Sequence, residues 1–66
     1  MIRLTKLDKT QLLVNVESIK YIEKTPDSLI FFNNGDRLIV AETLDEIETS
    51  MVELQRRILH TASPDQ

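Results

Sequence analysis

The chain has 66 residues, with no cysteine, one histidine, and 11 acidic against 8 basic residues. This composition excludes disulfides, thiolate metal sites and a multi-histidine metal site within one chain. The formal net charge of −3 disfavours nucleic-acid binding, which usually needs clustered Lys and Arg. No apolar run approaches the about 18 residues of a membrane span, and no signal-peptide core is present. We therefore expect a cytoplasmic protein that neither binds nucleic acid nor inserts into a membrane.

The length is near the lower limit for a self-sufficient hydrophobic core. Small domains usually compensate with disulfides, metals or oligomerisation, and the composition leaves only oligomerisation. We expect one domain over residues 1–60, a polar tail over residues 61–66, and a homo-oligomer.

The first half of the chain predicts three strands, over residues 2–6, 12–16 and 19–24. Residues 2–6 alternate apolar and polar side chains, as a strand with one solvated face does. A two-residue loop in the first hairpin would pair Leu4 with Leu13, and one more loop residue would pair Leu4 with Val14. The hydrophobic pattern favours the longer loop, and the shorter one stays open.

The segment 29–41, LIFFNNGDRLIVA, predicts a hairpin of two further strands, 29–33 and 37–41. Asn34-Gly35 favours a two-residue type I′ turn, because both central residues of that turn need φ > 0. This loop would pair Phe31 with Leu38 and Leu29 with Val40. Alternate side chains would then fall on the other face of the hairpin. That face would carry Ile30, Phe32, Ile39 and Ala41, interrupted by Arg37.

The periodicity then changes to that of a helix, over residues 44–60. Thr43 and Glu46 have the spacing of a capping box, in which each side chain accepts a hydrogen bond from the other residue's backbone N–H. An apolar stripe follows at steps of three and four residues. It consists of Leu44, Ile47, Met51, Leu54 and Ile58. The predicted fold is α+β: a small antiparallel five-stranded sheet, or β-hairpin meander, followed by one C-terminal amphipathic helix.

One helix can cover only one face of this sheet. If it covers the face of Leu29, Phe31, Leu38 and Val40, the opposite face is left in water. Burying a large apolar side chain is worth about 1.5–3 kcal/mol, so exposure would forfeit several kcal/mol. The candidate interface of the homo-oligomer is therefore Ile30, Phe32, Ile39 and Ala41. The faces exchange roles if the helix packs on the other side.

The sequence gives no positive indication of catalysis or of a cofactor. His60 is favoured as a solvated histidine at a helix end, and the serines have no paired base. The acidic residues from 42 to 53 fall on a helix rather than in an oxygen-ligand loop. Gly35 is the only glycine, so no phosphate-binding glycine-rich loop is present. We expect no enzyme activity, no metal and no cofactor.

The opening residues MIRLTKL resemble those of the small flagellar proteins of the FlbD or SwrD family. The resemblance continues through Val14-Asn15, residues 19–23, the Thr25-Pro26-Asp27-Ser28 turn and Asn34-Gly35, and it covers about residues 1–58. The family usually has Asn-Gly where this chain has Asp8-Lys9. Phe31-Phe32 is bulkier than the family pattern.

The resemblance implies a non-enzymatic accessory protein of bacterial flagellar motility and swarming. Such a protein would act by protein–protein interaction with a flagellar motor or export component, in the cytoplasm or at the flagellar base. An alternative is a small LytTR-like regulatory DNA-binding module. Residues 21–23, the Asn-Gly hairpin and residues 44–48 resemble such modules, which are longer and basic where they meet phosphate.

Overall fold

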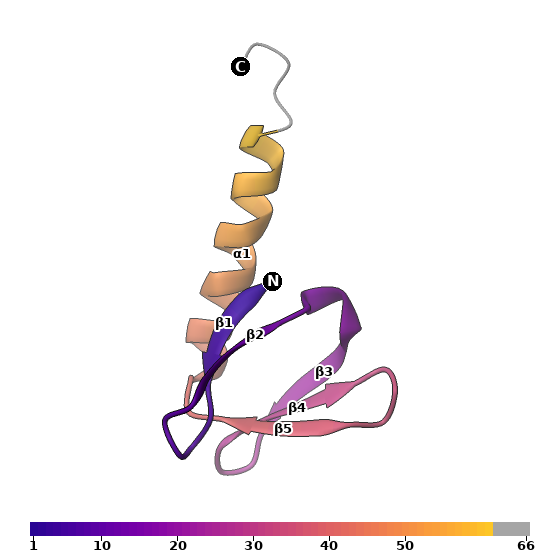
Figure 1. The fold of residues 1–66 in the computed structure, drawn as a ribbon, viewed down its shortest axis with the longest axis vertical. Helices are drawn as coiled ribbons and strands as arrows, with labels where there is room; N and C mark the ends of the chain where they lie inside the picture. Colours follow the sequence, from indigo (N-terminus) through magenta and orange to yellow (C-terminus); the bar gives the residue numbers. More distant parts are fainter. Residues whose placement is uncertain (62–66) are drawn as a thin grey trace.

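The computed structural model describes the backbone of residues 1–61 and the side chains of residues 1–57. These described residues fold into five strands, a short 3-10 helix and one long helix (Figure 1). In chain order these are β1 (Ile2–Thr5), β2 (Gln11–Val14), η1 (Val16–Ser18), β3 (Ile19–Lys24), β4 (Ser28–Phe32), β5 (Arg37–Val40) and α1 (Leu44–Thr61). The predicted α+β class and C-terminal helix are confirmed. The side chains of Ile58 and His60, and most of the predicted tail, lie outside the described residues.

The strands form two antiparallel sheets, β1-β2 and β3-β4-β5, so the prediction of one five-stranded sheet is wrong. The sheets meet at a single bridge between Lys6 and Val40. Next to it, the Ala41 N–H donates to the Thr5 carbonyl at 2.7 Å. The Thr5 N–H instead donates to the Glu42 carboxylate, with an N–Oε1 distance of 2.9 Å. A longer ladder between β1 and β5 would need the Thr5 N–H as a donor to β5. Because the Glu42 carboxylate accepts from this N–H, the ladder does not continue and the two sheets separate there.

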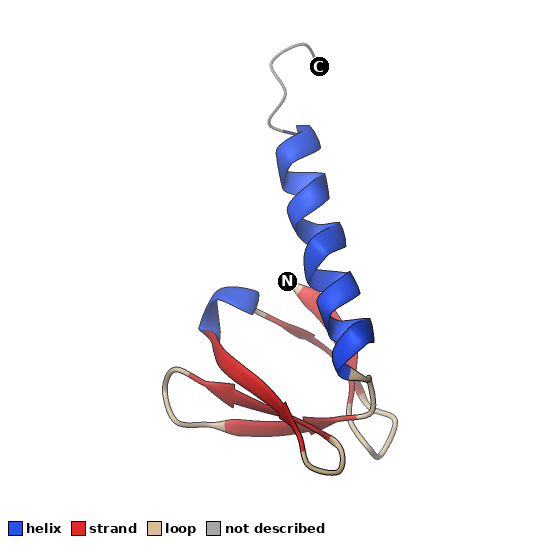
Figure 2. Ribbon diagram, turned by 180° about the vertical axis from the view of Figure 1, so that it is seen from behind, coloured by secondary structure: helices blue, strands red, loops and turns tan. Residues whose placement is uncertain are grey.

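The hydrophobic core lies between the β1-β2 hairpin, the three-stranded sheet and the first turns of α1 (Figures 1 and 2). All three parts contribute buried side chains. They are Ile2, Leu4, Val14, Ile30, Val40 and Ile47. Beyond the core, the C-terminal turns of α1 extend past the strands (Figure 1).

The β1-β2 and β4-β5 hairpins turn through three residues rather than two. In the first, the Lys6 N–H donates to the Thr10 carbonyl at 2.8 Å, and Leu4 pairs with Leu12. Neither predicted register of this hairpin is therefore correct. The loop ends with Lys9 in the left-handed region, at φ +74°, as a type I turn followed by a bulge requires.

The second hairpin uses the same turn. The Phe32 N–H donates to the Asp36 carbonyl at 2.9 Å, and Gly35 has φ +94°. The predicted type I′ turn is wrong, because within the described residues only Lys9 and Gly35 have positive φ. Ile30 therefore pairs with Leu38, and Leu29 pairs with Ile39. This one-residue change exchanges the two faces of β5 relative to β4.

The start of α1 is built as predicted. The Thr43 N–H donates to Glu46 Oε1 at 2.9 Å, and the Glu46 N–H donates to Thr43 Oγ1 at 3.1 Å. Ile47 is 1% exposed, and Met51 and Leu54 pack partly buried against the core. Because the capping box fixes where the helix begins, it also fixes which side chains face β1 and β3.

Candidate functional site

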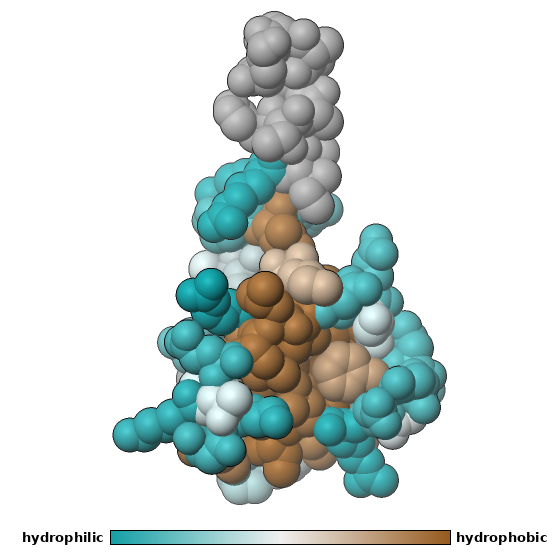
Figure 3. Space-filling view, in the orientation of Figure 1, coloured by the Kyte–Doolittle hydropathy of each residue, from teal (hydrophilic) through white to brown (hydrophobic). Residues whose placement is uncertain are grey.

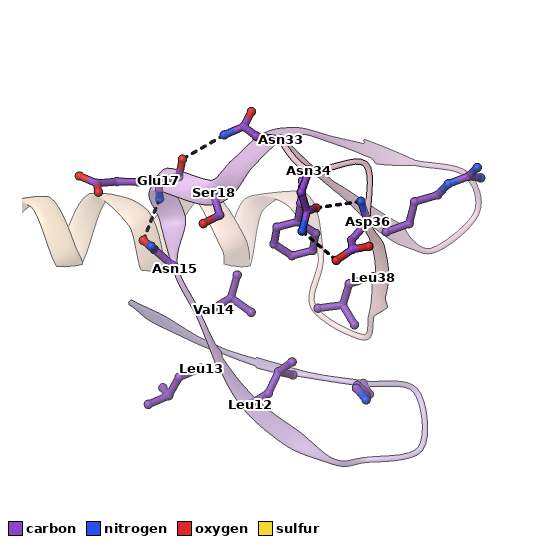
Figure 4. Close-up of a pocket in the computed structure, with 13 residues that line it drawn as sticks. Leu12, Leu13, Val14, Asn15, Glu17, Ser18, Asn33, Asn34, Asp36 and Leu38 are labelled. Atoms are coloured by element: carbon purple, nitrogen blue, oxygen red, sulfur yellow. Dashed lines mark hydrogen bonds between the residues drawn. The ribbon is translucent and has the colours of Figure 1, made fainter.

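A groove opens between the β1-β2 hairpin and the β4-β5 hairpin, with a volume of about 660 Å³. Its apolar lining comes from both sheets: Leu12, Leu13 and Val14 on one side, Phe32 and Leu38 on the other. Leu12, Val14 and Leu38 point into the space between the hairpins, whereas Leu13 is directed outward (Figure 4). The volume lies within the about 300–1,000 Å³ that is usual for binding sites.

Amide side chains organise the rim of this groove (Figure 4). Asn33 joins the β4-β5 turn to η1: its N–H donates to the Ser18 carbonyl at 2.9 Å, and its Nδ2 donates to the Glu17 carbonyl at 3.2 Å. At the start of η1, the Asn15 side chain accepts a hydrogen bond from the Glu17 N–H at 3.1 Å. These bonds close the side of the fold on which β2 and β3 share no backbone ladder.

The groove is apolar at its floor and electrically mixed at its rim. Lys6 and Arg37 carry positive charge there, and Glu17 and Asp36 carry negative charge. In the part of the chain whose side chains are described, every buried polar side-chain atom has a hydrogen-bond partner. In the view of Figure 3, hydrophobic residues gather in the middle of the molecule and hydrophilic residues frame them. The groove is therefore suited to receiving apolar side chains.

A second exposed apolar surface lies on the side of the three-stranded sheet that faces away from the core. We call it the outer face, and define it as Tyr21, Glu23, Leu29, Phe31, Arg37 and Ile39. Tyr21 and Phe31 stack with ring centroids 4.5 Å apart, and Arg37 Cζ lies 5.9 Å from the centre of the Phe31 ring. Tyr21 is 45% exposed and Ile39 is 46% exposed.

The four residues of the predicted interface do not share one surface. Ile30 is 0% exposed in the core, and Phe32 is partly buried beside the groove. Ile39 lies on the outer face, and Ala41 is exposed just after β5. This grouping is corrected because the three-residue turn shifts β5 by one residue relative to β4.

Sequence reasoning missed Tyr21, Leu29 and Phe31 as surface residues. The signal that could have found them is Arg37. In a three-residue loop with Gly35 in the left-handed position, Arg37 falls opposite Phe31 and so marks the solvated face. Asn33-Asn34-Gly35 suits that loop as well as Asn34-Gly35 suits the type I′ turn.

The Asp8 carboxyl lies in the first hairpin turn and does not line the groove; hydrogen bonds from the backbone and side chain of Thr10 lower its pKa. Ser28 is buried, but its hydroxyl donates to the Glu42 carbonyl at 2.6 Å. Among residues with described side chains, no group of three His, Cys, Asp or Glu is placed to hold a metal ion.

Comparison with known proteins gives one finding. A family model described as FlbD, flagellar and swarming motility proteins, matches residues 1–59. The chain belongs to the FlbD family. The resemblance noted from the sequence is thus confirmed, and FlbD membership indicates a role related to flagellar or swarming motility. FlbD is a motility-associated family and not a known enzyme family.

No curated protein and no solved structure matches the chain. None of the helical segments that the structure describes is long and apolar enough to cross a membrane.

Proposed function

We propose that this protein supports flagellar motility without catalysis, by binding a protein component of the flagellar motor or export apparatus in the cytoplasm or at the flagellar base. The match of the FlbD family model to residues 1–59 carries this proposal. The proposal adds a mode of action to that match, namely protein–protein contact.

The groove supports this mode of action. Its apolar lining stays partly accessible in the folded chain, because Leu12, Phe32 and Leu38 are only half-buried. The rim hydrogen bonds of Asn33 hold the two walls together, so little ordering is needed when a partner binds. Because charges of both signs surround the floor, the groove suits a partner segment that presents apolar side chains and has little net charge.

The DNA-binding alternative gains no comparable support. Affinity for DNA comes largely from basic side chains that contact phosphates, and the chain has 11 acidic against 8 basic residues. We therefore retain the protein-binding function alone.

A deletion strain provides the test. Loss of the gene should reduce swarm expansion and swimming speed in viscous medium, and expression of the wild-type chain should restore both. Leu12→Glu, in a chain that a thermal melt shows to be folded, should fail to restore them, because a charge in the groove opposes contact with an apolar segment. Leu12→Met should restore them.

Val52→Glu is the matched control. Val52 is an exposed apolar residue of α1, 43% accessible, and it does not line the groove. It should complement as well as the wild type. Unchanged motility in the deletion strain would contradict the proposed function. Full complementation by Leu12→Glu would contradict the groove as the binding surface.

A further inference from the structure

We propose that the outer face binds the outer face of a second copy of this chain, forming a two-fold symmetric dimer. This inference does not depend on the partner or the role proposed above. It is carried by the arrangement of side chains on the three-stranded sheet.

The register of the three strands places six side chains in two rows. One row is Tyr21, Phe31 and Arg37, and the next is Glu23, Leu29 and Ile39. Each row runs across β3, β4 and β5 in that order. Phe31 and Leu29 of β4 therefore occupy the middle. Glu23 and Arg37 occupy one pair of diagonally opposite corners, and Tyr21 and Ile39 occupy the other pair.

This diagonal makes the face complementary to itself. In a face-to-face dimer the two-fold axis lies between the two sheets, and each contact occurs twice. An axis perpendicular to the line from Glu23 to Arg37 places each Arg37 opposite Glu23 of the second copy. Two contacts between opposite charges then form together, and the apolar residues meet between them. The strands of the two sheets cross steeply, near the orthogonal class of sheet packing.

The same charges argue for a second copy over a different occupant. A strongly acidic or strongly basic partner would meet a charge of its own sign at one corner, and such contacts are unfavourable. The Phe31 ring, at the centre of the face, is also held in place before binding. Its centroid lies 4.5 Å from the centroid of the Tyr21 ring and 5.9 Å from Arg37 Cζ. Association therefore costs little side-chain entropy at this position.

The size of the face limits the affinity. Strand spacing and rise give a surface of about 14 Å by 17 Å. Stable complexes usually bury about 800 Å² on each partner, which is more than this face offers. We therefore expect a dimer with a micromolar Kd, which dissociates on dilution.

Charge exchange tests the geometry in the full 66-residue chain. Sedimentation equilibrium from about 1 to 200 μM covers the expected micromolar range and should show monomer and dimer in exchange. Glu23→Arg and Arg37→Glu should each weaken the dimer by about tenfold or more, because symmetry creates each like-charge contact twice. The double variant should recover most of the wild-type affinity.

Glu48→Arg is the matched control, since it reverses an exposed acidic residue on α1 outside the outer face. It should leave the dimer unchanged, and thermal melts should show that all variants are folded. A wild-type chain that stays monomeric at about 200 μM, well above a micromolar Kd, would overturn the proposal. A double variant as weak as the single ones would overturn it too.

The motility assay separates this proposal from the previous one. If the wild type is monomeric but Ile39→Glu abolishes complementation, the outer face binds a different protein. The second-copy proposal is then wrong, while the motility function stands.

Discussion

The β1-β2 and β4-β5 turns have the same backbone geometry but different residues in it. In the first, the closing bonds are Lys6 N to Thr10 O at 2.8 Å and Lys9 N to Lys6 O at 2.9 Å. The corresponding bonds of the second, Phe32 N to Asp36 O and Gly35 N to Phe32 O, measure 2.9 and 3.0 Å.

In each loop, the side chain of the middle residue accepts a hydrogen bond from the backbone N–H two residues later. The Asp8 carboxylate accepts from the Thr10 N–H at 3.0 Å, and the Asn34 side chain accepts from the Asp36 N–H at 2.9 Å. The difference lies one residue later, where the left-handed position holds Lys9 in one turn and Gly35 in the other. A shared geometry with unequal residues shows that the strands can impose a turn that the local sequence does not favour.

The largest loss of stability is expected for substitutions in the core, where side chains of the β1-β2 and β4-β5 hairpins meet. Leu4 of the first hairpin and Ile30 of the second are both 0% exposed. Replacing either with Ala should lower the free energy of unfolding by about 2–5 kcal/mol, because each leaves a cavity. Urea unfolding followed by circular dichroism measures this loss. If the hairpins are one cooperative unit, both variants unfold in a single transition, and a separate early transition for Leu4→Ala would show that they are independent.

The next largest loss of stability is expected for Gly35→Lys, which gives the β4-β5 turn the same residue that the β1-β2 turn has in its left-handed position. No atom lies within 4 Å of an added Cβ at this position, so the effect is conformational rather than steric crowding by neighbours. Holding a non-glycine residue at φ +94° should cost about 1–2 kcal/mol. Gly35→Asn should cost less, since Asn tolerates the left-handed region. Equal stability of Gly35→Lys and the wild type would contradict this account.

The reverse change, Lys9→Gly, should stabilise the protein. It relieves the left-handed strain at φ +74° but increases the freedom of the unfolded chain, so the net gain should be about 0.5–1 kcal/mol. Thermal unfolding should show a higher Tm. Lys24→Gly provides the control, because Lys24 is also exposed but lies in β3, where glycine should destabilise.

The smallest effect is a pH dependence confined to the first turn. Hydrogen bonds from Thr10 lower the pKa of Asp8 in the folded chain. A carboxyl with a depressed folded pKa contributes stability above its unfolded pKa and loses it as pH falls through the folded value. Asp8→Asn should therefore show a flatter loss of stability than the wild type below about pH 4. Urea midpoints between about pH 5 and pH 2 span this window, and identical slopes would rule out a contribution from Asp8.

The sequence by itself determined the features that rest on contacts within a few residues. The Thr43–Glu46 capping box sets the start of α1 through two reciprocal hydrogen bonds, and turn-forming residues mark where the strands end. The family resemblance was also readable, because it depends on residue order alone. These features needed no knowledge of the rest of the chain.

Tertiary structure decided the registers, the faces and the division into two sheets. A loop of two residues and a loop of three both suit Asn34-Gly35 locally, so the choice depends on which side chains the core accepts, here Ile30 and Val40. The junction of the sheets depends on the Glu42 carboxylate reaching the Thr5 N–H, across 37 positions of sequence. Such a contact exists only after the chain has folded, because local patterns carry no record of which distant donor a side chain will meet.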